Sequence, residues 1–184
     1  MTQQQLPFAT EPLHPLMPRW LPHVDARANL RLVHRDLYVG SAVAVLFRPG
    51  SGRDWWGAVD AHGPAHSEAF RREARFGELA ACIRFGFEDG GPVPPALIEA
   101  AVGLARGRRG PLLICCAMGV SRSASVAYCV IRAETGATHE EALRAVSCPQ
   151  GRPLPATLAS ARAWADARAA RPADGSSLIV ARAP

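Results

Sequence analysis

The sequence predicts an α/β fold with a central, mostly parallel sheet flanked by helices. Short apolar segments with the length of strands are interspersed with segments of helical periodicity, and glycine or proline residues separate many of them. In residues 111–131 a strand-like segment runs through a loop of small residues directly into a helix. The strand-like segment before it, residues 82–87, is joined to it by one helix, a connection typical of parallel strands in one sheet.

Length and composition are those of one domain with terminal extensions. The chain has 184 residues, of which 48% are hydrophobic and 20% charged, enough for a substantial core. We place the domain at residues 30–170. Residues 1–29 have prolines at positions 7, 12, 15, 18 and 22, which predicts an irregular proline-rich arm, and residues 171–184 predict a C-terminal tail.

Charge and cysteine content exclude several classes of function. The formal net charge is +5 and every basic residue is arginine, but the arginines are scattered, so no nucleic-acid interface is expected. No run of about 18 apolar residues and no secretory leader are visible, so we expect neither a membrane span nor export. The five cysteines follow no zinc or disulfide spacing, which favours a cytoplasmic location. The oligomeric state cannot be read from the sequence.

The first half of the domain holds strand candidates and one helix. Residues 30–39 alternate loosely up to Gly40, residues 57–60 form another strand candidate, and residues 42–47 are apolar but too short to assign. Ser67 is a suitable N-cap for a charged helix over residues 68–79.

The second half is richer in helices. After the strand at residues 82–87, a Pro-Pro pair opens a helix over residues 96–105, and the strand at 111–115 leads to a helix from residue 123 to 135. Thr138 caps a helix over residues 138–146 and forms a capping box with Glu141. An amphipathic helix covers residues 158–169.

Residues 116–122, CAMGVSR, form a stretch that we call the cysteine loop. The helix after it begins with unpaired N–H groups and a partial positive charge, which suits the loop to an anion. A thiolate at Cys116 and a phosphoryl group above it both fit this field, and Arg122 can fold back to hold two phosphate oxygens. The alternative is a buried cysteine that packs as a small apolar side chain.

Three other arginines are poor candidates for contact with a ligand at this loop. Arg106, Arg108 and Arg109 precede the strand at residues 111–115 and therefore lie at its amino end. Ligands of open α/β sheets bind at the carboxyl ends of the strands.

Cleavage of a phosphate ester by a thiolate also requires an acid that protonates the leaving oxygen. Asp89 is the best candidate, because it follows a strand, lies in a glycine-rich loop and is one helical crossover away from Cys116. Glu88 is the alternative acid, and an ordinary acidic turn is the alternative explanation of the segment.

No metal or other cofactor is expected. His62 and His66 have a spacing that suits a helical metal pair, but Gly63 and Pro64 lie between them and would break that helix.

Several segments together resemble one known family. ICCAMGVSRSAS is similar to the active-site signature of the dual-specificity, cysteine-based protein phosphatases, usually written HCxxGxSRS. FEDGGPVPP is similar to the general-acid loop of the same superfamily, and LYVGS, EALRAV and RPLP resemble further landmarks. The resemblance covers roughly residues 30–168. It implies the compact dual-specificity-phosphatase fold and a metal-free, two-step hydrolysis through a cysteinyl-phosphate.

The resemblance also implies a role for each matching residue. Cys116 would be the nucleophile, Arg122 the phosphate clamp and Asp89 the general acid. Ser123 would stabilise the thiolate when it leaves in the second step. Backbone amides would bind the phosphate at Ala117, Met118, Gly119, Val120, Ser121 and Arg122.

This sequence departs from the family pattern at one important position. The family usually has histidine before the nucleophile, where it supports the loop by hydrogen bonds, and this chain has Cys115. The loop is then expected to be less rigid and the thiolate less stabilised. The variable loop positions carry no charge, whereas phosphoinositide phosphatases usually place lysine there, so a phosphorylated protein or a small phosphate ester is the expected substrate.

Two other functions remain open alongside an active phosphatase. The first is a pseudophosphatase that binds phosphorylated proteins without turnover. The second is thiol chemistry of the arsenate-reductase or rhodanese type, which the position of the loop at residue 116 disfavours. A separate hypothesis concerns redox control, in which Cys82 on a neighbouring strand traps oxidised Cys116 as a disulfide.

Overall fold

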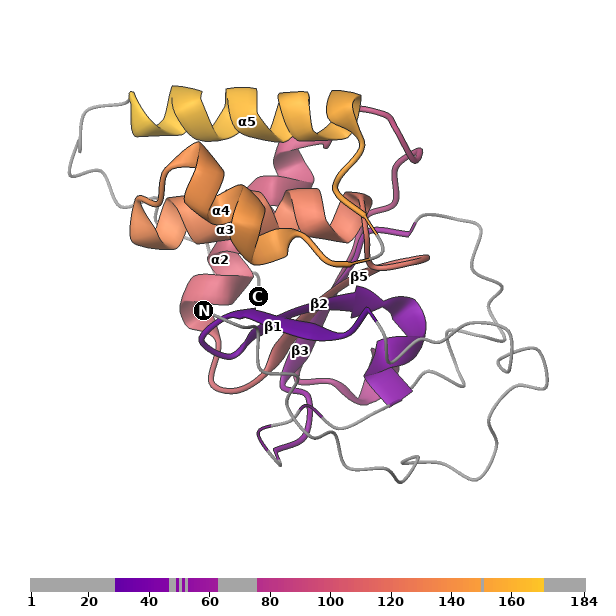
Figure 1. Cartoon of the computed structure of the whole chain (residues 1–184). Helices are drawn as coiled ribbons and strands as arrows, with labels where there is room; N and C mark the ends of the chain where they lie inside the picture. The colour runs from indigo at the N-terminus through magenta and orange to yellow at the C-terminus, as the bar shows by residue number, and fades with distance from the viewer. Residues whose placement is uncertain are drawn as a thin grey trace.

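The computed structural model describes residues 29–46, 49, 51, 53–62, 76–149 and 151–170. Figure 1 shows how its helices and strands are arranged. The strands are β1 (Arg31–His34), β2 (Leu37–Ser41), β3 (Gly57–Asp60), β4 (Ala81–Arg84) and β5 (Leu112–Cys116). The α-helices are α2 (Pro95–Gly107), α3 (Arg122–Thr135), α4 (His139–Val146) and α5 (Pro155–Ala169), and two short 3-10 helices are η2 (Ala42–Leu46) and η3 (Phe76–Glu78).

The five strands form one sheet in the order β1-β2-β5-β3-β4. Only β1 runs antiparallel to its neighbour, and the other pairs are parallel, as predicted. β5 lies at the centre, with Cys116 opposite Ser41 of β2 and Cys115 opposite Asp60 of β3. The carboxyl ends of three strands therefore meet beside the cysteine loop, where ligands of parallel sheets bind.

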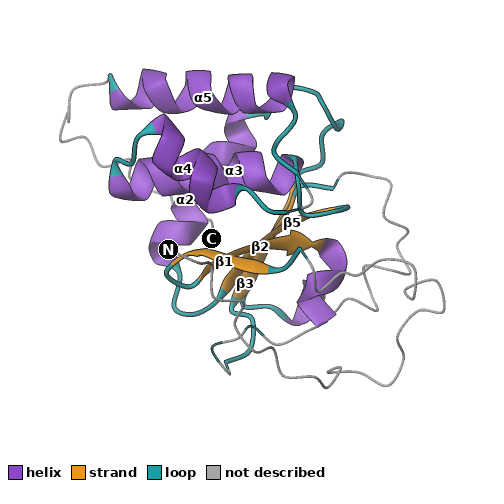
Figure 2. Cartoon of the chain, viewed as in Figure 1, coloured by secondary structure: helices purple, strands orange, loops and turns teal. Residues whose placement is uncertain are grey.

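The two faces of the sheet belong to two apolar cores. Helices α2 to α5 gather on one side (Figure 2), and their apolar side chains pack against Leu112, Ile114 and Cys116 of β5. On the other face Leu113 and Cys115 pack with the residues of η2. Because successive strand residues point to opposite faces, the two adjacent cysteines lie in different cores.

The predicted strand over residues 30–39 is wrong as a single element. It is the hairpin of β1 and β2, which turns at Arg35 and Asp36, and Arg35 has a left-handed φ of 39°. No glycine or proline marks this turn, so the alternating pattern continued through it in the sequence.

Other predicted boundaries shift by a few residues. The strand expected at residues 82–87 is β4, Ala81–Arg84, which ends three residues earlier than expected. Its neighbour β3 ends at Asp60, so the last backbone bond between them runs from Phe85 N to Asp60 O. The helices expected at 96–105 and 158–169 begin earlier, each with a proline in the first turn, and α2 continues to Gly107.

The remaining predictions divide between confirmed and untested. The capping box of Thr138 and Glu141 is confirmed at the start of α4. The short apolar segment after β2 is the 3-10 helix η2, and only η3 falls inside the helix predicted over residues 68–79. Ser67 and most of that helix, like the predicted arm and tail, lie outside the described residues, so the domain limits stay a prediction. Within the described part, no helix is both long and apolar enough to span a membrane.

Candidate active site

The cysteine loop makes a tight turn between β5 and α3. Gly119 takes a left-handed φ of 73°, and its backbone presses against the end of β2. A Cβ atom at this position would lie only 2.4 Å from Gly40 C and 2.7 Å from Ser41 N. Only glycine combines this dihedral angle with this approach, which explains the residue type at the middle of the loop.

The thiol of Cys116 lies inside this turn. Its side chain is buried, and Sγ receives the N–H of Gly119 at 3.3 Å. The hydroxyl group of Ser123, on the first turn of α3, lies 3.2 Å from the same sulfur atom. The backbone N–H thus donates to the sulfur atom, and either Ser123 Oγ or Cys116 Sγ can be the donor in the second contact.

Cys115 has a different environment. It is fully buried in the core on the other face, and desolvation there raises the pKa of its thiol well above the ordinary value. Cys115 therefore remains a neutral thiol. Of the two adjacent cysteines, only Cys116 has its sulfur atom inside the cysteine loop.

The amino end of α3 has no side-chain cap. Ser121 occupies the N-cap position without bonding to the helix, and its Oγ instead accepts a hydrogen bond from Leu154 N at 3.0 Å. The first-turn N–H groups of α3 thus receive no cap from their own N-cap residue, and they face the loop with the positive end of the helix dipole. This is the arrangement that binds phosphate groups in many folds.

The guanidinium of Arg122 is held by backbone oxygens at the edge of the site. One of its terminal nitrogens donates to His62 O at 2.6 Å and to Phe87 O at 3.1 Å. Its Nε atom is buried and makes no hydrogen bond within the described residues, although Oδ1 of Asp89 lies 3.6 Å away. The clamp therefore keeps an unused buried donor beside a carboxylate.

The structure brings the predicted site residues together in two pairs. Ser123 contacts Cys116, and Asp89 faces Arg122 from the loop between β4 and α2. The Asp89 side chain is 57% exposed, so it can meet a ligand at the mouth of the site. Glu88, the alternative acid, is exposed and contributes its carbonyl oxygen to the turn at Gly91.

Sequence reasoning missed two residues that touch the cysteine loop from outside. Asn29 Nδ2 donates to Met118 O at 2.7 Å, and an Arg31 nitrogen donates to Gly119 O at 2.8 Å. No sequence signal separates Arg31 from the other basic residues, since all 21 are arginine and the contact spans 88 positions.

Apolar side chains lie on the rim of the site. Met118 in the loop is 53% exposed. Leu154, whose backbone N–H donates to Ser121 Oγ, is 41% exposed. A Cβ atom on Gly90 would lie 3.7 Å from Leu154, so this leucine borders the segment that carries Asp89. The rim can thus contact an apolar part of a ligand next to its anionic group.

The sheet rules out the hypothesis that Cys82 traps Cys116 directly. Strand β3 lies between β4 and β5, and Cys82 is level with Leu113, three positions before Cys116. Two strand spacings alone amount to about 9.5 Å, more than the roughly 7 Å between Cα atoms that a disulfide tolerates.

The described residues contain no cluster of three or more histidine, cysteine or acidic side chains that could hold a metal ion. The predicted weakness of a His62–His66 pair stays untested, because His66 lies outside the described residues.

Two hollows lie away from the cysteine loop. One, of about 420 Å³, is lined by Arg106, Arg108 and Arg109 together with the turn at Arg35, which confirms that these arginines lie far from the loop. Arg108 is paired there with Glu134 at 2.5 Å. Since α2 and α3 both end here, positive side chains offset the negative ends of their dipoles.

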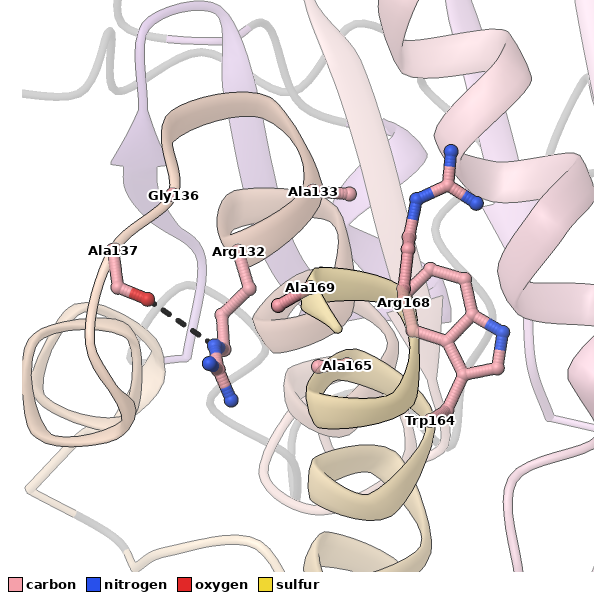
Figure 3. Close-up of a pocket in the computed structure, with 8 residues that line it drawn as sticks. All are labelled: Arg132, Ala133, Gly136, Ala137, Trp164, Ala165, Arg168 and Ala169. Atoms are coloured by element: carbon pink, nitrogen blue, oxygen red, sulfur yellow. Dashed lines mark hydrogen bonds between the residues drawn. The ribbon is translucent and has the colours of Figure 1, made fainter. Parts of the chain in front are cut away.

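The other hollow, of about 240 Å³, lies between α3 and α5 (Figure 3). Arg132 donates to Ala137 O at 3.1 Å and pairs with Asp166, and Arg168 stacks on Trp164. Both arginines thus already have partners, and none of the described residues that line the two hollows is a candidate nucleophile.

Comparison with known proteins supports the fold. No family model and no curated protein matches the chain. Human DUSP28 is 22% identical, with 77% of this chain and 96% of that chain covered at a TM-score of 0.60. A mouse putative dual specificity phosphatase complexed with zinc tungstate is 19% identical, with 78% and 90% covered at 0.59. PTPMT1 is 17% identical, with 77% and 98% covered at 0.59. The chain therefore has the fold of the dual-specificity and tyrosine phosphatases, as its sequence resemblance predicts.

Proposed function

We propose that this chain is a cysteine-dependent phosphatase that hydrolyses phosphate monoesters through a cysteinyl-phosphate intermediate. One observation carries the proposal. The buried Sγ of Cys116 receives the Gly119 N–H and lies beside the Ser123 hydroxyl, at an uncapped helix start and in the same loop as Arg122. A nucleophile, donors to it and an anion cradle thus occupy one short segment.

The first step transfers the phosphoryl group to sulfur. The Cys116 thiolate attacks phosphorus while Arg122 and the N–H groups of the loop hold the other phosphate oxygens. The bond between phosphorus and the ester oxygen breaks, and that oxygen takes the proton of Asp89. The alcohol or phenol then leaves, and a cysteinyl-phosphate remains.

The second step regenerates the enzyme. Asp89, now a carboxylate, accepts a proton from water as the water oxygen attacks phosphorus. The sulfur–phosphorus bond breaks and inorganic phosphate is released. Ser123 and the Gly119 N–H stabilise the departing thiolate, the role that their contacts with Sγ support.

The proposed substrate is a phosphorylated protein, on tyrosine or on serine and threonine. Support comes from the exposed apolar rim at Met118 and Leu154 and from the uncharged variable positions of the loop. The alternative is a pseudophosphatase that binds the same group without turnover. A cytoplasmic location stays a prediction from the sequence.

The test is hydrolysis of an aryl phosphate by the purified full-length chain in EDTA, between about pH 5 and pH 8. We expect turnover to survive chelation, and acid quenching during turnover to leave one phosphoryl group on the Cys116 peptide, detected by mass spectrometry. Vanadate binding without any hydrolysis would move the assignment to the binding module. Loss of activity with the chelator would contradict the thiolate mechanism.

Replacing Asp89 with asparagine should reduce the hydrolysis of phenyl phosphate by about 10²–10⁴-fold, the usual contribution of a general acid. Dinitrophenyl phosphate should lose much less, because its leaving oxygen departs without a proton. The measurement is kcat/KM for both esters. Glu88→Gln is the matched control and should leave both rates unchanged. If Glu88→Gln has the larger effect on the phenyl ester, the acid is Glu88.

A further inference from the structure

Two side chains outside the cysteine loop hold its carbonyl groups. Asn29 Nδ2 donates to Met118 O, and Arg31 donates to Gly119 O. Asn29 is 5% exposed, so this contact is protected from water. Arg31 is the first residue of β1 and Asn29 lies two positions before it, in a segment with no candidate for the chemistry itself.

The two ends of one peptide group connect Asn29 to the nucleophile. Met118 O and Gly119 N–H belong to the same peptide unit, which is trans, so they point in opposite directions. The oxygen accepts the Asn29 bond while the N–H donates to Cys116 Sγ. In the same way, the bond from Arg31 to Gly119 O turns the N–H of Val120 away from Arg31. Hydrogen bonds on the carbonyl also strengthen the donor at the other end of the peptide.

Arg31 brings a positive charge to the outer side of the loop. Its guanidinium donates to three backbone oxygens, those of Asn29, Gly119 and Val146, and no carboxylate in the described part of the chain pairs with it. Burial lowers the pKa of Arg31, and the coulombic interaction with Cys148 and Cys116 in their ionised forms opposes that shift. Since arginine stays protonated in proteins, Arg31 keeps a positive charge on the outer side of the loop.

We propose that Asn29 and Arg31 are the positioning residues of the cysteine loop, and that they orient its N–H groups and favour the thiolate of Cys116. They take over the support that the histidine before the nucleophile gives in the resembled family. Cys115 cannot give it, because it lies in the core on the opposite face of the sheet. The inference rests on the proposed function, since the bound anion is taken to be phosphate.

The experiment compares Arg31→Met, Arg31→Lys and Asn29→Ala with the wild type. The first readout is the rate of alkylation of Cys116 by iodoacetamide as a function of pH, followed on its peptide by mass spectrometry. The second is the Kd for vanadate. Alkylation needs no turnover, so it reports on the two residues even if the wild type hydrolyses no ester, a result that would count against the proposed function alone.

We expect Arg31→Met to move the alkylation profile to higher pH and to weaken vanadate binding about tenfold or more, as for a lost charge-assisted hydrogen bond. Arg31→Lys, which keeps the charge but has fewer donors, should restore part of both. Asn29→Ala should slow alkylation of Cys116 with a smaller effect on vanadate. If Arg31→Met does not fold, the other two variants decide.

Arg132→Met is the matched control. Arg132 also bonds a backbone oxygen, at Ala137, and is partly buried, but it lies in the hollow between α3 and α5 (Figure 3). We expect a loss of thermal stability without any change in alkylation or vanadate binding. The proposal is overturned if the Arg31 and Asn29 variants behave like this control, with lower stability but an unchanged alkylation profile and vanadate Kd.

Discussion

Replacing Cys116 with serine is expected to abolish phosphate ester hydrolysis, with kcat falling by about 10⁴-fold or more, as when other enzymes lose their nucleophile. A serine hydroxyl is not ionised near neutral pH, and the two groups that contact Cys116 Sγ in the described part of the chain, the Gly119 N–H and the Ser123 hydroxyl, include no base that would activate it. The side chain is buried and the exchange nearly isosteric, so the fold and the anion cradle should persist. The measurements are aryl phosphate turnover and vanadate binding on the same preparation.

Cys82→Ser is the control for this exchange. Cys82 is an exposed thiol on β4, two strands away from Cys116, so its loss should leave turnover unchanged. Cys116→Ser protein that still turns over the ester would contradict the assignment of the nucleophile. Loss of vanadate binding in Cys116→Ser would instead show that the cradle depends on the sulfur.

Replacing Gly119 with alanine is expected to cost both stability and activity. The added Cβ would lie 2.4 Å from Gly40 C and 2.7 Å from Ser41 N. Both are backbone atoms of β2, so they cannot rotate away as a side chain could. A left-handed φ costs about 1–2 kcal/mol for a residue with a side chain, and crowding of this kind about 1–3 kcal/mol more. Displacement of the Gly119 N–H from Cys116 Sγ should also lower kcat by about a hundredfold or more.

Gly136→Ala isolates the contribution of the close approach. Gly136 has nearly the same φ, 69°, but a Cβ there would meet nothing within 4 Å. Urea denaturation of both variants should show only the smaller, conformational loss for Gly136→Ala, with activity unchanged. Equal losses of unfolding free energy in the two variants, with activity retained in both, would show that the end of β2 moves to accommodate the added Cβ atom.

The candidate-site residues that the sequence predicts, and that the structure brings together, are mostly close to one another along the chain. One strand, loop and helix contain Cys116, Gly119, Arg122 and Ser123, so a short stretch of sequence is enough to recognise their pattern. Asp89 is distant from Cys116 in the sequence, and its prediction relied on a helical crossover between two parallel strands of one sheet. The observed sheet order and parallel pairing agree with that expectation. The family resemblance extended the same local information.

The parts that sequence reasoning missed depend on contacts between distant segments. Asn29 and Arg31 reach the loop across 89 and 88 positions, and neither stands out among similar residues. The turn at Arg35 was missed because a left-handed φ is uncommon for arginine and nothing in the residue type announces it. The carbonyl groups that hold Arg122 belong to His62 and Phe87. Every residue has a backbone oxygen, so the residue types do not indicate which ones make this contact.

The guanidinium of Arg122 is held in one orientation by two backbone carbonyl groups of the protein itself, those of His62 and Phe87, which belong to separate segments. An arginine side chain that is free to rotate loses about 2 kcal/mol of conformational entropy when it is immobilised. Here that loss occurs when the protein folds and not when an anion arrives. An incoming phosphate should therefore bind about thirtyfold more tightly than it would to a mobile arginine at the same place.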